Sequence, residues 1–158
     1  VSLDRQTKLL AKKILNEKHI FYLGRGLDYA VALEGSLKLK ETSYIQSEAY
    51  PAGELKHGPI ALIDNCTTIV AINTNSALYQ KTDSNIKEVI SRGAKVIYIT
   101  PEKNKSSYDE TLYIPSTDDL LYPLVSTVPL QLLAYHTAVY KNCDVDKPKN
   151  LAKSVTVE

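Results

Sequence analysis

The stretch His19-Ile20-Phe21-Tyr22-Leu23-Gly24-Arg25-Gly26 decides the fold. Its first five residues predict a short buried strand, because apolar and aromatic side chains follow one another without a break. The Gly-Arg-Gly sequence predicts a tight turn, and Asp28 is placed to cap a helix that runs to about Tyr44. A buried strand, a glycine turn and a helix in this order are the first half of a βαβ unit.

The rest of the chain continues this alternation. We expect a helix over residues 3–17, further strands over 67–72, 95–100 and 111–114, and further helices over 77–91 and 118–141. Pro129 is expected to restart or kink the last helix, with Thr127 as its new cap. Residues 45–59, which contain two prolines and two glycines, are expected to be irregular. The pattern predicts an α/β domain with a doubly wound parallel sheet flanked by helices, a flavodoxin-like three-layer sandwich.

Composition narrows the class of protein. The chain has 158 residues, enough for one such domain, and 19 basic against 18 acidic side chains give a net charge of +1. Because the basic residues are interspersed with acidic ones, we expect no nucleic-acid partner, and no apolar run approaches the roughly 20 residues that span a membrane. Cys66 and Cys143 are too few for a disulfide framework or a metal site, so a reducing, cytoplasmic setting is expected. The chain has no Met and opens on Val1, as a piece of a longer chain would; removal of an initiator Met is the alternative.

Ligands of doubly wound domains bind at the carboxyl ends of the strands, which directs attention to the segments after Leu23, Ile72 and Thr100. The glycine turn at residues 24–26 suits an anion at a helix N-terminus, but it is equally consistent with a plain tight turn. A dinucleotide-binding fingerprint would require Gly or Ala where this chain has Tyr29. We therefore expect no nucleotide cofactor.

Glu34, Lys38 and Glu41 recur at helical spacing and form one charged stripe. We expect the buried face of this helix to lie beside the stripe and to consist of Ala30, Leu33 and Leu37. Charges at the rim of a core are suited to acid or base catalysis. An ordinary ion-pair ladder on the surface is the alternative, and spacing alone favours it.

Two further side chains are candidates for chemistry. His57 lies in a loop bounded by Gly and Pro, and its ordinary pKa suits acid–base work, although a histidine that caps a neighbouring backbone group fits as well. His19 and His136 are expected to be packing residues. Lys153 lies in a C-terminal segment without helical period, where a solvated cation and a Schiff-base lysine are both possible.

Three strings taken together resemble the glucosamine-6-phosphate synthase family, the isomerising glutamine:fructose-6-phosphate amidotransferases. They are Glu-Gly-Ser-Leu-Lys-Leu-Lys-Glu at 34–41, Ala-Tyr-Pro-Ala-Gly-Glu-Leu-Lys-His-Gly-Pro at 49–59 and Asn-Leu-Ala-Lys-Ser-Val-Thr-Val-Glu at 150–158. The resemblance covers essentially the whole chain. It implies that residues 1–142 are the second of two SIS (sugar isomerase) domains, trimmed at its start, and that 143–158 are the C-terminal tail.

The resemblance also implies an activity, the conversion of fructose-6-phosphate and glutamine-derived ammonia to glucosamine-6-phosphate without a metal or cofactor. Glu41 matches the carboxylate that moves a proton between carbons 1 and 2 of the sugar, and Lys38 matches a cation that orients the substrate. His57 matches the residue that opens the sugar ring, in the site of the neighbouring subunit of a homodimer. Lys153 matches the lysine that forms an imine with the open-chain ketose, and the backbone of Ala152 is expected to line the sugar.

The glutaminase domain and the first SIS domain, which supplies the main phosphate ligands, are absent from this sequence, so we expect little or no turnover from this chain alone. Lys149 stands where the family commonly has Arg, and Lys lacks the bidentate fork of Arg. One alternative function is a non-catalytic SIS module that binds sugar phosphates for regulation. A redox domain of the flavodoxin type is a third, but no cofactor signature supports it.

Overall fold

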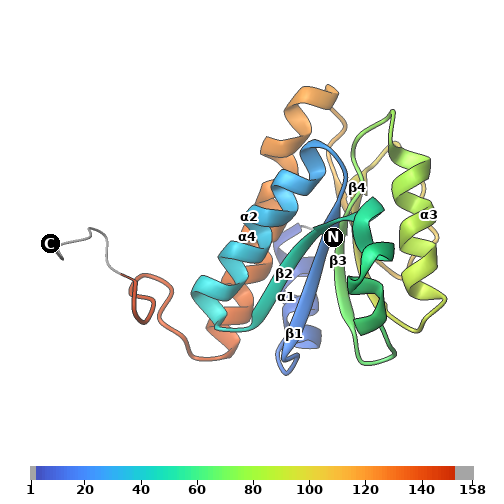
Figure 1. Ribbon diagram of the computed structural model, residues 1–158. Coiled ribbons are helices and arrows are strands. Elements are labelled where there is room, and N and C mark those ends of the chain that lie inside the picture. Colours follow the sequence, from blue (N-terminus) through green and yellow to red (C-terminus); the bar gives the residue numbers. More distant parts are fainter. Residues whose placement is uncertain (1–2, 152–158) are drawn as a thin grey trace, which may run out of the picture.

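The computed structural model describes residues 3–151, and within them five parallel strands form one sheet (Figure 1). The strands are β1 (His19–Gly24), β2 (Gln46–Pro51), β3 (Thr68–Ile72), β4 (Lys95–Pro101) and β5 (Glu110–Ile114), in the order β2-β1-β3-β4-β5. All four pairings are parallel. This order is that of a flavodoxin-like doubly wound sheet, so the predicted fold class is confirmed.

Helices cover both faces of the sheet (Figure 1). One layer consists of α1 (Leu3–Ile14), α2 (Leu27–Ser43) and α4 (Tyr122–Tyr140), the last preceded by the short helix η3 (Asp119–Leu121). The other layer contains α3 (Tyr79–Ile90) and the 3-10 helices η1 (Ala52–His57) and η2 (Pro59–Leu62). Because strand side chains alternate, Ile20 and Tyr22 join the first core, whereas Phe21 and Leu23 join the second.

Asp28, in the first turn of α2, bonds the loop that follows β3 at the carboxyl end of the sheet. Its buried carboxylate accepts hydrogen bonds from the backbone N–H of Thr74 (2.8 Å) and of Asn75 (3.3 Å) and from the Thr74 hydroxyl. Burial raises the pKa of Asp28 above its ordinary value. The prediction that Asp28 caps α2 is wrong, because the N-cap is Gly26, at φ 57°, and the carboxylate instead bonds the loop after β3.

The prediction that residues 45–59 are irregular is wrong over the six residues of β2. This strand lies at the edge of the sheet and pairs with β1 alone, with Phe21 opposite Glu48 and Leu23 opposite Tyr50. An edge strand tolerates polar side chains and a terminal proline, so it lacks the continuous apolar run that identifies a central strand.

The prediction that Pro129 restarts the last helix is also wrong, whereas the alternative of a kink stays a prediction. α4 runs without interruption through Pro129, and the Thr127 hydroxyl donates to the carbonyl of Pro123 instead of capping a new helix. Pro129 and Leu130 are buried where α4 packs between α1 and α2. Tertiary packing therefore outweighs the hydrogen bond that the proline removes.

The face of α2 that packs inward differs from the predicted one. The large residues Leu33 and Leu37 are 48% and 40% exposed, and Ala30 is exposed as well. The buried face carries mostly smaller residues, namely Val31, Ala32, Gly35, Ser36 and Leu39. A methyl group on Gly35 would lie 2.7 Å from Leu130 Cδ1 and 3.0 Å from Tyr22 Cε1. Small side chains let α2 approach β1 and α4 closely, which a pattern based on hydrophobic size does not detect.

Cys66 and Cys143 are both free thiols, in agreement with the sequence. No helix within residues 3–151 combines the length and the apolar character needed to cross a bilayer. The same part of the chain contains no cluster of three or more His, Cys, Asp or Glu side chains that could hold a metal ion.

Candidate active site

Lys38 and Glu41 form a close ion pair near the end of α2. The Lys38 Nζ lies 2.8 Å from Glu41 Oε2 and 3.8 Å from Glu34 Oε1. The hydrogen bond from Lys38 to Glu41 raises the pKa of Lys38 above its ordinary value. The Glu41 side chain is 27% exposed, so it is partly shielded yet open to a ligand from outside the layer. The predicted charged stripe exists, and this geometry fits both a catalytic carboxylate with its cation and a plain ion-pair ladder.

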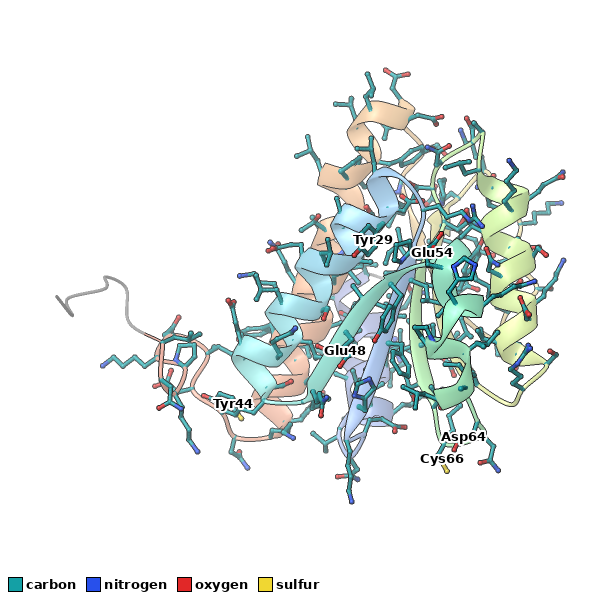
Figure 2. The ribbon with its side chains drawn as sticks, in the orientation of Figure 1. Tyr29, Tyr44, Glu48, Glu54, Asp64 and Cys66 are labelled. Carbon is teal, nitrogen blue, oxygen red and sulfur yellow. The ribbon has the colours of Figure 1, made fainter. Side chains whose placement is uncertain are left out.

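The C-terminal segment contacts the end of this same helix. Tyr44 caps α2 in the left-handed conformation, at φ 59°. Its hydroxyl accepts the backbone N–H of Lys149 at 2.7 Å, and the Lys149 Nζ lies 5.5 Å from the centre of its ring. Figure 2 shows Tyr44 at the end of α2, where the chain turns toward β2. Lys153 and Ala152 lie outside the described residues, so their predicted roles stay predictions.

Tyr44 is a residue that sequence reasoning missed. Tyr is a common core side chain, and its sequence neighbours Ser43 and Ile45 indicate only the end of a helix. The contact with Lys149 spans 105 residues of sequence, and no local pattern predicts a pairing over that separation.

His57 ends η1, on the opposite face of the sheet from α2. Leu55 of the same 3-10 helix is buried among α3 side chains, which fixes η1 on that face. The His57 ring is exposed, at 71%, and its Nδ1 lies 2.8 Å from Glu54 Oε2. It therefore pairs with a carboxylate and not with a backbone group. In Figure 2, Glu54 lies toward α3, whereas Tyr44 marks the far end of α2. Within one copy of the chain, the structure does not bring His57 to Glu41.

The other two histidines and the arginine of the glycine turn make structural contacts. His136 is buried between α1 and α4, with Nε2 2.9 Å from Asp4 Oδ1, which confirms it as a packing residue. His19 packs edge-on against Phe21. The Arg25 guanidinium donates twice to Asn85 Oδ1, at 3.0 and 3.2 Å. Arg25 thus holds the glycine turn against α3.

The family assignment rests on the sequence model of the SIS domain, which matches residues 13–141. The chain belongs to the SIS domain family. It is 59% identical to the glutamine–fructose-6-phosphate aminotransferase (isomerizing) of Clostridium tetani over 98% of this chain and 26% of that protein. The corresponding enzyme of Agrobacterium fabrum is 50% identical over 97% of this chain and 26% of its own length.

Solved structures agree with this assignment. The C-terminal domain of glucosamine-fructose-6-phosphate aminotransferase from Francisella tularensis superposes with a TM-score of 0.87 at 46% identity, over 92% of this chain and 42% of that one. A glucosamine-6-phosphate deaminase from Thermotoga maritima gives a TM-score of 0.75 at 31% identity, over 97% of this chain and 46% of that one. The chain thus spans about a quarter of the length of the curated relatives it matches and less than half of these structures.

Proposed function

We propose that this SIS domain, residues 1–142, and the tail, residues 143–158, supply part of the sugar-isomerising site of a glutamine–fructose-6-phosphate aminotransferase. The observation that carries the proposal is the Lys38–Glu41 pair of 2.8 Å at the end of α2, on the helix that also contacts the tail. The strong similarity to aminotransferases of that name supports it. The proposed setting is the cytoplasm. In the complete protein the first SIS domain binds the phosphate group of the sugar, and the glutaminase domain supplies the ammonia.

In the proposed reaction a ketose phosphate and ammonia give an amino aldose phosphate and water. The neutral amine of Lys153 attacks carbon 2 of the open-chain ketose and forms an imine, with loss of water. Ammonia then adds at carbon 2 and expels the Lys153 amine, so the nitrogen of ammonia remains on carbon 2 and the lysine is regenerated. The Glu41 carboxylate takes a proton from carbon 1 and returns it to carbon 2, which needs one base able to reach both carbons. Lys38, hydrogen-bonded to Glu41, holds that carboxylate in place and orients the substrate. The backbone of Ala152 lines the sugar.

His57 acts in the site of a second subunit in this proposal. The support is its position on η1, on the face of the sheet opposite α2, with an exposed ring that Glu54 orients. Ring opening requires a proton to move between the ring oxygen and the anomeric hydroxyl, for which a histidine is suited. A homodimer that brings η1 of one copy to α2 of the other completes the site.

The test is a chimera in which this chain replaces the corresponding quarter of the Clostridium tetani relative. We expect the chimera to make glucosamine-6-phosphate, and we expect Lys153→Ala and Glu41→Gln to abolish product. Lys153→Ala should also abolish the imine that borohydride traps with fructose-6-phosphate. Sugar-phosphate binding without any trapped imine would contradict the proposal and favour a regulatory binding module.

A further inference from the structure

The feature that carries a new inference is the contact between Tyr44 and Lys149. Tyr44 stands at the C-cap of α2 with a left-handed backbone, and its N–H bonds the carbonyl of Lys40. Glycine adopts this conformation without steric penalty and is the usual residue at such a position. A tyrosine in this place is best explained by its side chain, which binds the tail through the hydroxyl and the ring.

Residues 143–151, the part of the tail that the structure describes, make few other hydrogen bonds to the domain. The Cys143 N–H bonds the carbonyl of Ala138, at the end of α4. The remaining hydrogen bonds that we describe for residues 144–151 link that segment to itself, from Asp146 and Lys147 to Asp144 and from Leu151 to Pro148. In the sequence Lys153 lies four residues beyond Lys149, which Tyr44 binds, and ten residues beyond Cys143.

We infer that Tyr44 is a positioning residue that anchors the tail beside Glu41, so that Lys153 is held within reach of the same substrate. This inference rests on the proposed function. Tyr44 follows Glu41 by three residues, so their Cα atoms are separated by about one helical turn. Four residues extend at most about 14 Å from Lys149, whereas ten residues from Cys143 extend about 35 Å.

The shorter segment raises the effective concentration of the Lys153 amine at the substrate. For a flexible chain, effective concentration falls as about the −3/2 power of segment length, which predicts a fourfold loss on release of Tyr44. If the amine instead explores the whole volume within its reach, the loss is about 16-fold. Imine formation should therefore slow by about 4- to 16-fold while the chemistry at Glu41 is unchanged.

Two variants separate this role from a structural one. Tyr44→Phe keeps the ring and removes the hydroxyl that accepts the Lys149 N–H. Tyr44→Gly removes the whole contact and suits the left-handed backbone, so the domain should keep its stability. Tyr135→Phe, an exposed tyrosine of α4, is the matched control.

The first measurement is amide hydrogen exchange at Lys149 in the 158-residue chain. Both Tyr44 variants should accelerate exchange by about 2- to 12-fold, the range of one typical net hydrogen bond, and Tyr135→Phe should not. The second is the rate of imine trapping with borohydride and fructose-6-phosphate in the chimera. Tyr44→Gly should slow trapping by about 4- to 16-fold without a change in the unfolding midpoint.

The outcomes distinguish this inference from the proposed function. If the Tyr44 variants trap the imine as fast as the unmodified chimera, Tyr44 does not position Lys153, although the proposed function stands. If Lys153→Ala still gives the imine, or the unmodified chimera gives none, the proposed function fails and this inference with it.

Discussion

Gly35 fixes the distance between α2, which carries Lys38 and Glu41, and the neighbouring elements. In Gly35→Ala the new methyl group would lie 2.7 Å from Leu130 Cδ1 and 3.0 Å from Tyr22 Cε1, and both side chains are fully buried. Overpacking of this kind costs about 1–3 kcal/mol, whereas Ala in place of Gly in a helix gains about 1 kcal/mol. We expect a net loss of about 1 kcal/mol in the free energy of unfolding. At a typical urea m value of about 2 kcal/mol/M, the midpoint falls by about 0.5 M.

The same substitution can also be tested in a second variant, Leu130→Ala, which removes most of one of the two neighbouring side chains. Leu130→Ala alone should cost about 2–5 kcal/mol, because it leaves a cavity in the core. In that background Gly35→Ala should destabilise less than in the unmodified chain, because the 2.7 Å contact with Leu130 Cδ1 is gone while the 3.0 Å contact with Tyr22 Cε1 remains. Lys40→Ala, at an exposed position of α2, is the control and should change stability by less than about 0.5 kcal/mol. A gain of about 1 kcal/mol from Gly35→Ala in the unmodified chain would refute the close packing described here.

Three further predictions concern the carboxyl edge, the ion pair and the tail. Because burial raises the pKa of Asp28, the contribution of this residue to stability should be fully present below its ordinary value of 3.8 and should be lost as pH rises through the higher pKa of the folded state. Urea titrations of the unmodified chain and of Asp28→Asn at several pH values should differ by this contribution. Lys38→Met should change the unfolding free energy by less than about 1 kcal/mol, because the Lys38–Glu41 pair is partly exposed. It should lower product formation by the chimera by about tenfold or more. An unchanged rate would show that the pair is only a structural ion pair on the surface. Product formation by the isolated chain at the rate of the chimera would show that the upstream domains are dispensable, whereas we expect little or none.

The sequence predicts those parts of the fold that depend on periodicity. β1, β3, β4 and β5 are apolar and β-branched runs, and the helices carry regular patterns, so their order and the sheet type follow from residues alone. The pattern does not predict β2, because a strand at the edge of the sheet can contain polar residues such as Gln46 and Glu48. The pattern does not predict that α4 is continuous, because packing around Leu130 compensates for the hydrogen bond that Pro129 removes. Local helix propensity contains no information about that packing.

The candidate site shows the same division. The spacing of Glu34, Lys38 and Glu41 predicts a charged stripe, which the structure confirms. The side of the stripe that packs inward is set by the fit of Gly35 against Leu130 and Tyr22. These three residues come from α2, α4 and β1, which are far apart in the sequence. Side-chain size is the wrong guide there, so Leu33 and Leu37 point outward.

The most direct test of the account uses two variants of the chimera, Glu41→Gln and His57→Ala, mixed so that their subunits exchange at random. Glu41 and His57 of one copy lie on opposite faces of the sheet, and in the proposed dimer they belong to different active sites. Each variant alone should be inactive. In the mixture, about half of the dimers combine the two variants, and each of these holds one site with both native residues, so about a quarter of the unmodified activity should return. No recovery in verified mixed dimers would contradict the shared site.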